Sequence, residues 1–224
     1  MAIYEIVSTL AFFGALWWVL RSRDSFALGA LLGGFFLFGF DWIWCAKWFF
    51  NATFNADLTM IPGIHIMEQR YPIAVAFNWA VGFGFLPLLL SKLHPTLSRK
   101  LGMLHFPIVL AVAAVLDMCA EVPLVSGLGV YKYHQAPEYL LWGVPWSNLW
   151  FGGGLLALPY FGLAYAKKWA AIPSGAGFSP SSETTWKGIF MAAATLWGSF
   201  FFLTVLQLFW YSATAPWVDS GRLF

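Results

Sequence analysis

Long apolar stretches alternate with short polar connections along the whole chain. A helix that crosses a bilayer needs about 20 mostly apolar residues, and six stretches have roughly this length. Proline and glycine occur inside several of them, which membrane helices tolerate because neighbouring helices satisfy the freed backbone groups. The pattern predicts an all-α polytopic membrane helical bundle of six or seven transmembrane helices, forming a single integral membrane domain over residues 1–224. The predicted spans are residues 3–20, 26–48, 72–90, 106–125, 148–166 and 188–211.

The composition strengthens this prediction. Hydrophobic residues make up 60% of the chain, charged residues make up 10%, and the mean hydropathy is +0.72. A soluble domain has about 25% charged residues, so this chain cannot cover its apolar surface with a polar one. The first stretch has no basic segment before it and no A-x-A cleavage signal, so we expect it to be retained. A net charge of +2 offers no basic patch for nucleic acid, and the expected surroundings are the lipid bilayer.

Basic residues predict the orientation, because lysine and arginine are enriched in cytoplasmic loops. Most of them fall in the connections after spans 1, 3 and 5, which we therefore expect to be cytoplasmic, with both termini on the outer side. These residues are Arg21, Arg23, Lys92, Arg99, Lys100, Lys167, Lys168 and Lys187. Acidic residues show the opposite bias, which suggests a site in the outer half of the bundle. The acids on that side are Glu5, Asp41, Asp57, Glu68, Asp117, Glu121, Glu138 and Asp219.

Two carboxylates, Asp117 and Glu121, interrupt the fourth predicted span. They are four residues apart, so both project from the same face of a helix. A charged side chain near the bilayer centre costs roughly 2.5–3.5 kcal/mol on insertion scales, and two like charges at this spacing also repel. We therefore expect the pair to share one proton, which suits a general acid. The alternative is a structural hydrogen bond or ion pair with a neighbouring helix, with Arg70 or Lys47 as the partner.

A third acid, Asp41, lies in the second predicted span among tryptophans. Trp48 fits the aromatic belt at a membrane interface, but Trp42 and Trp44 flank the acid deeper in the helix. An aromatic face stabilises a nearby cation by about 2 kcal/mol or more when the pair is desolvated. An acid beside such faces is suited to generate a carbocation and then to hold it.

The connection over residues 51–71 is long and partly apolar, which predicts an interfacial segment or a lid over the site. Glu68 in this connection is a further candidate catalytic acid. His65, Glu68 and His134 could also ligate a metal, as carboxylate and histidine sets in helical bundles do. No E-x-x-H pair is repeated, so we expect neither a metal nor another cofactor.

Residues 136–154 combine a proline-bounded turn, aromatic residues and Asn148 at the start of the fifth span. Asn148 fits a helix cap, and it equally fits a polar group that faces a pocket and positions water or a substrate oxygen. The run Gly152–Gly154 permits either close helix packing or the approach of a bulky ligand. The candidate substrate-binding residues on this side of the membrane are Trp42, Trp44, Trp79, Tyr131, Trp142, Trp146 and Asn148.

The order of these residues resembles that of the carotenoid hydratases, integral membrane proteins that add water to an acyclic isoprenoid end group. Asp117 comes first, then Glu121-x-Pro123, then Gly129-x-Tyr131, and then Gly143-Val144-Pro145-x-Ser147-Asn148. The resemblance covers residues 114–155 and implies that Asp117, Glu121 and Asn148 are site residues. The glycine-rich motif of that family's first half is absent. Small membrane-bound terpene cyclases have a similar length and paired acids, but no motif matches them residue by residue.

These observations favour acid catalysis on a lipophilic isoprenoid substrate. A protonated carboxyl donates to an alkene or epoxide, aromatic faces hold the cation, and water or ring closure ends the reaction. The expected enzyme is an isoprenoid hydratase, which is a lyase, or a terpene cyclase, which is an isomerase. The competing hypotheses are a proton-coupled transporter, in which intramembrane acids relay protons, and a membrane subunit that binds a lipid, quinone or pigment.

Overall fold

The computed structural model describes residues 2–46, 49–55, 64–66, 69–169 and 182–214. Six helices in this part of the chain are long and apolar enough to cross a membrane, which agrees with the six predicted spans. They run over Ile3–Ser22, Ser25–Cys45, Ile73–Ser91, His94–Gly127, Asn148–Trp169 and Glu183–Thr214. The last helix extends beyond the predicted residues 188–211 at both ends.

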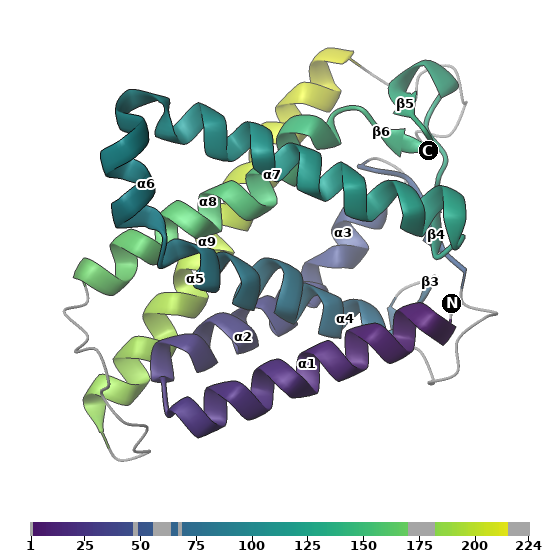
Figure 1. Cartoon of the computed structure of the whole chain (residues 1–224). Helices are drawn as coiled ribbons and strands as arrows, with labels where there is room; N and C mark the ends of the chain where they lie inside the picture. The colour runs from purple at the N-terminus through teal and green to yellow at the C-terminus, as the bar shows by residue number, and fades with distance from the viewer. Residues whose placement is uncertain (1, 47–48, 56–63, 67–68, 170–181, 215–224) are drawn as a thin grey trace.

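Several of these spans are built from more than one helical segment (Figure 1). The α-helices are α1 (Ala2–Ser22), α2 (Ser25–Leu37), α3 (Asp41–Cys45), α4 (Ile73–Trp79), α5 (Leu86–Ser91), α6 (His94–Leu101), α7 (His105–Val122), α8 (Asn148–Trp169) and α9 (Glu183–Thr214). Shorter turns of other helix types are η1 (Phe38–Phe40), η3 (Ala80–Phe85), η4 (Gly102–Leu104), η5 (Pro123–Gly127) and η6 (Pro137–Tyr139).

Close contacts between small residues hold α2 against its neighbours. A Cβ atom on Gly29 would overlap the backbone of Ile189 in α9, and one on Gly33 would lie 2.9 Å from the Cα atom of Ala193. The two glycines are four residues apart, which is the spacing that lets membrane helices approach closely. Gly34 makes a similarly close approach to Gly84 in η3. Helix α2 therefore lies between α9 and η3.

Helix α7 packs mainly along α8. A Cβ atom on Gly153 in α8 would lie 2.9 Å from the backbone nitrogen of Ala114 in α7, so the two helices are close at this level. The regular α-helix ends at Val122 because Pro123 has no N–H to continue it. The chain goes on as the π-helical turn η5, in which Leu128 donates a backbone hydrogen bond to Pro123.

Short strands gather at one end of the bundle, which the prediction of an all-α fold did not include. Strand β1 (Ala52–Phe54) pairs antiparallel with β4 (Tyr131–Tyr133), so that Thr53 lies opposite Lys132. Two further antiparallel pairs are formed by β2 (Ile64–Ile66) with β3 (Gln69–Tyr71), and by β5 (Leu140–Leu141) with β6 (Val144–Pro145). The predicted interfacial segment or lid over residues 51–71 thus contains three strands, while residues 56–63 and 67–68 lie outside the described chain.

The opposite end of the bundle carries a short additional helix between α5 and α7. Residues 94–101 form the helix α6, and His105 is buried at the start of α7. The Nε2 atom of His105 lies 2.9 Å from the hydroxyl of Tyr160 in α8. This polar contact joins α7 and α8 near the end of the bundle that is rich in basic residues.

We predict that Gly29→Ala lowers the free energy of unfolding by about 1–3 kcal/mol, because the added methyl group pushes α2 and α9 apart. Thermal unfolding of the purified protein in detergent measures the change. Gly14→Ala is the matched control, since no atom lies within 4 Å of a Cβ atom at this position. Equal melting temperatures for the two variants would contradict the close packing of α2 on α9.

Candidate active site

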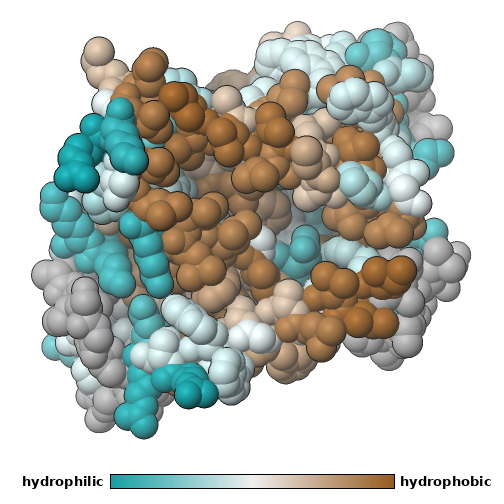
Figure 2. Space-filling model, viewed as in Figure 1, coloured by the Kyte–Doolittle hydropathy of each residue, from teal (hydrophilic) through white to brown (hydrophobic). Residues whose placement is uncertain are grey.

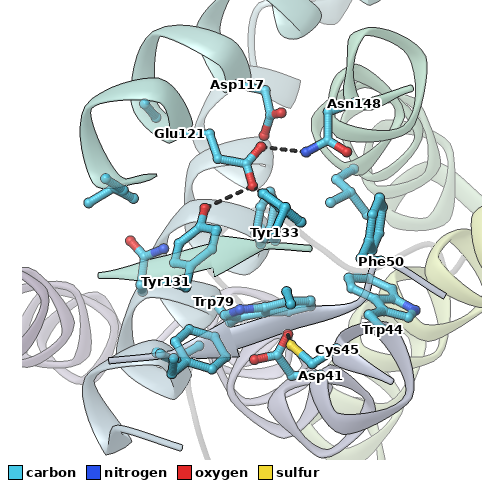
Figure 3. Close-up of a pocket in the computed structure, with 18 of the residues that line it drawn as sticks. Asp41, Trp44, Cys45, Phe50, Trp79, Asp117, Glu121, Tyr131, Tyr133 and Asn148 are labelled. Atoms are coloured by element: carbon cyan, nitrogen blue, oxygen red, sulfur yellow. Dashed lines mark hydrogen bonds between the residues drawn. The ribbon is translucent and has the colours of Figure 1, made fainter. Parts of the chain in front are cut away.

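A cavity of about 140 Å³ lies between the helices at the end that carries the strands (Figure 3). Residues far apart in the sequence form its walls. They come from α1, α3, α4 and η3 on one side, from α7, η5 and α8 on the other, and from β1 and β4 at the end. The three candidate acids Asp41, Asp117 and Glu121 all line it.

The carboxylate of Glu121 accepts hydrogen bonds from three side chains. Its Oε1 atom accepts from the hydroxyl of Tyr131 at 2.8 Å and from the hydroxyl of Tyr133, and its Oε2 atom accepts from the amide nitrogen of Asn148. Hydrogen bonds to a carboxylate stabilise its charged form. These three donors therefore replace water around Glu121 in an otherwise apolar cavity.

The two tyrosines reach Glu121 because they belong to one strand. Tyr131 and Tyr133 are two residues apart in β4, so both side chains point to the same face. The pairing of β4 with β1 fixes this face towards the cavity. Burial, and then the nearby charge of Glu121, raise the pKa of both phenols well above its ordinary value. Both tyrosines remain protonated donors at neutral pH.

Asn148 is the first residue of α8, and 4% of it is exposed. Of the two roles considered for this residue, the structure shows the polar group that faces the cavity. Because its amide nitrogen donates to Glu121, its Oδ1 atom is left as an acceptor. This buried oxygen has no hydrogen-bond partner among the described residues. It is an unsatisfied acceptor on a residue that lines the cavity.

Asp117 lies one helical turn before Glu121 but has a different environment. A Cβ atom on Gly152 would overlap the Asp117 carboxylate, so this glycine provides the space that the acid occupies. The buried Oδ2 atom of Asp117 has no hydrogen-bond partner within the described part of the chain. The glycine run of α8 thus serves close packing, against Asp117 at Gly152, Ala114 at Gly153 and Leu203 at Gly154.

Asp41 forms a second acidic position, beyond Trp44 and Trp79 from Glu121 in the view of Figure 3. The 3₁₀ turn η1 ends directly before this residue, which is 5% exposed. Cys45, one turn later, has its sulfur atom 3.9 Å from the Oδ1 atom of Asp41. The Oδ2 atom is buried and, among the described residues, has no hydrogen-bond partner.

Aromatic rings form the wall between the two acidic positions. The centroid of Trp44 lies 4.8 Å from that of Trp79 and 5.5 Å from that of Phe200, on which it stacks. The indole nitrogen of Trp44 donates to the hydroxyl of Thr204 at 2.9 Å, which fixes the ring. Phe151 contacts Trp44 edge-on. The ring faces are therefore held by packing and by a hydrogen bond.

The structure brings together most, but not all, of the predicted site residues. Those that line the cavity are Asp41, Trp44, Trp79, Asp117, Glu121, Tyr131 and Asn148. Trp142 does not line it: the residue is 69% exposed at the turn between β5 and β6. Trp146 packs edge-on against Trp210, away from the cavity. Glu68 and the side chain of Trp42 lie outside the described residues.

Several lining residues were not among the predicted ones. Tyr133, Cys45 and Asn78 are polar examples, and Tyr4 and Phe50 are aromatic ones. The alternation of Tyr131 and Tyr133 signals a strand with one polar face, but a three-residue strand is too short for this signal to stand out. The close approach at Gly152 has no sequence signal beyond the glycine run itself.

The described side chains contain no group of three His, Cys, Asp or Glu residues placed to hold a metal ion. One of the three residues considered as metal ligands is His134, and its Nε2 atom lies 2.8 Å from the hydroxyl of Thr53. The side chains of His65 and Glu68 lie outside the described residues, so a metal site that includes them stays untested.

Comparison with models of known protein families, with curated proteins and with solved structures finds no match for this chain. The candidate site is therefore interpreted from its own geometry.

Proposed function

We propose that this protein is an integral membrane enzyme that adds water to a carbon–carbon double bond of a lipophilic isoprenoid. The observation that supports this best is the unequal hydrogen bonding of two neighbouring acids. Glu121 accepts three hydrogen bonds, whereas the buried Oδ2 atom of Asp117 accepts none from the described residues. The pair is thus arranged to keep one negative charge on Glu121 and one proton on Asp117.

In this scheme Asp117 is the general acid. Its proton goes to one carbon of the double bond, and the more substituted carbon becomes a tertiary cation. The ionised Glu121 lies one turn away and stabilises the positive charge, as do the faces of Trp44 and Trp79. Because the cavity is largely apolar, these electrostatic interactions are stronger than they would be in water.

Asn148 favours hydration over ring closure as the final step. Its free Oδ1 atom can accept a hydrogen bond from a water molecule, whose lone pair then attacks the cation. The new C–O bond forms, and the extra proton of the water returns to the Asp117 carboxylate, so the net reaction is addition of one water. If water is not held there, the cation can lose a proton back to the Asp117 carboxylate and return an alkene of unchanged mass.

We also propose that the six apolar helices are inserted in a bilayer with the basic end of the bundle on the cytoplasmic side. Basic side chains gather at this end: Arg21 lies over the ring of Trp17, Lys92 lies over that of Trp18, and Lys167 is 3.9 Å from Asp24. The C-terminal ends of α1, α5 and α8 lie on the same side of the bundle (Figure 1). This supports the positive-inside orientation, with both termini outside.

The central prediction concerns the acid pair. Purified protein in detergent, incubated with lycopene or squalene, is expected to yield a product heavier by one water, detected by mass spectrometry. Asp117→Asn and Glu121→Gln are each expected to lower the rate by about 100-fold or more, since the first removes the general acid and the second removes the stabilising charge. Glu138→Gln, an exposed acid at the same end, is the control. Full turnover by both acid variants would rule out the scheme, and binding without conversion by the wild type would favour a binding subunit.

A second prediction separates the water-holding role of Asn148 from its hydrogen bond to Glu121. Asn148→Leu removes both, whereas Tyr133→Phe removes only a donor to Glu121. We expect both variants to be slower, but only Asn148→Leu to shift the product from the water adduct to an alkene isomer, by about tenfold in ratio. Reaction in ¹⁸O-labelled water measures the adduct. An unchanged product ratio in Asn148→Leu would remove Asn148 from the hydration step.

The position of Asp117 provides a third prediction. Gly152→Ala places a methyl group where the Asp117 carboxylate lies, so the acid must turn away from the cavity. We expect turnover to fall by about tenfold or more while the protein remains folded. Gly198→Ala in α9 is the control, because a Cβ atom there meets nothing within 4 Å. Equal rates for the two variants would show that the placement of Asp117 does not matter.

A further inference from the structure

One side of the cavity is not closed by helix packing. Helix α7 packs along α8, while α4 and η3 pack against α1 and α2. Among the described elements, no comparable contact joins α7 to α4 or to α1. Closer to the basic end, α5 packs on α8, so the separation of α7 from α4 occurs at the level of the acids.

The residues on the two edges of this separation are partly exposed although they line the cavity. Ala120 of α7 is exposed, and Leu124 of η5 is half-buried. On the other edge, Asn78 of α4 and Phe83 of η3 are half-buried. We call the gap between these four residues the lateral opening. It lies within the helices that are apolar enough to cross a membrane.

The surface around the lateral opening is strongly apolar. Figure 2 shows a hollow between the brown side chains over α7 and those over α1, with hydrophilic atoms visible inside it. The large exposed apolar residues on the two helices are Ile3, Ile6, Val7, Leu10, Phe13, Trp17, Leu20, Phe106, Ile108, Val112, Val115 and Leu116. Such faces are typical of helices that contact lipid. The opening therefore connects the cavity and its acids with the expected position of the hydrocarbon chains.

The cavity is too small for a whole isoprenoid chain. Its volume of about 140 Å³ is close to the roughly 150 Å³ of an engineered apolar cavity that holds one benzene molecule. It accommodates one isoprene unit, so the remainder of a longer chain must lie outside. At the end of the bundle the cavity meets β1 and β4, which are tied to each other by backbone pairing.

We propose that the isoprenoid enters the cavity sideways from the bilayer through the lateral opening, and that only its end unit reaches the acids. This inference rests on the proposed function for the nature of the ligand. The rest of the chain stays in the groove between α7 and α4–η3, in contact with lipid. The site accordingly selects an acyclic end group by the size of the cavity and tolerates chains of different length. Ala120 is the residue whose size limits entry.

The test uses a synthetic acyclic isoprenoid with an isopropylidene group at one end and an alkyl diazirine at the other. The protein is placed in phosphatidylcholine nanodiscs and irradiated, and labelled peptides are mapped by mass spectrometry. We expect labels on the outer edges of α7 and α4–η3. Ala120→Trp should lower this labelling by about tenfold, since the indole fills the opening. Cys119→Trp, at the neighbouring exposed position, should leave it unchanged.

Labelling and turnover are measured on the same samples, so that a failure of sideways entry can be distinguished from a failure of hydration. Labels on β1 and β4, or labelling that Ala120→Trp does not alter, overturn sideways entry even if the wild type hydrates its substrate. Labels at the opening that Ala120→Trp abolishes support sideways entry even if no product forms, in which case hydration fails. If Ala120→Trp does not fold, the positions of the labels on the wild-type protein alone decide between entry through the lateral opening and entry past β1 and β4.

Discussion

The stable placement of one carboxylate inside an apolar cavity is the constraint on which the site depends. A buried charge is costly unless hydrogen bonds replace its water. For Glu121 the replacement comes from Tyr131, Tyr133 and Asn148, which belong to a strand and a helix that no local sequence pattern links. The pairing of β4 with β1 and the packing of α7 on α8 are both needed to bring these donors to one point. The hydrogen bonding of Glu121 therefore depends on the correct folding of this end of the molecule.

Small residues make the rest of this arrangement possible. Gly152 makes room for the carboxyl group of Asp117, and Gly153 brings the backbones of α7 and α8 together. Regular helix geometry is interrupted at the same level, by η1 before Asp41, by η3 at Phe83 and by η5 at Leu124. Such irregular turns often occur at functional sites because they redirect side chains without ending a span. Here η3 and η5 each contribute a residue to the lining of the cavity, and η1 directly precedes the lining residue Asp41.

The sequence predicted the features that depend on local pattern. Helical spacing placed Asp117 and Glu121 on one face, and hydropathy placed the six long helices. It did not predict the partners of Glu121, because Tyr133 becomes a donor only through a strand whose partner lies about eighty residues away. Trp142, in contrast, was predicted to be a site residue but lies outside the site. Its proximity to Asn148 in sequence suggested a place in the site, but the tight turn at Gly143 directs it outward.

The position of the lateral opening follows from which helices cover the two sides of α7. Helix α7 carries both acids, so its inner face must be covered by α8, which supplies Asn148 and the glycine at Asp117. A helix packed as closely on the side of α4 would bury Ala120 and close the cavity on that side. With that side unpacked, Ala120 is exposed, while Leu124 and Phe83 remain half-buried at the edges of the lateral opening. Under the proposed function, the acids are thus shielded from bulk water while the end group of an isoprenoid can still reach them, as acid catalysis on a substrate dissolved in the membrane would require.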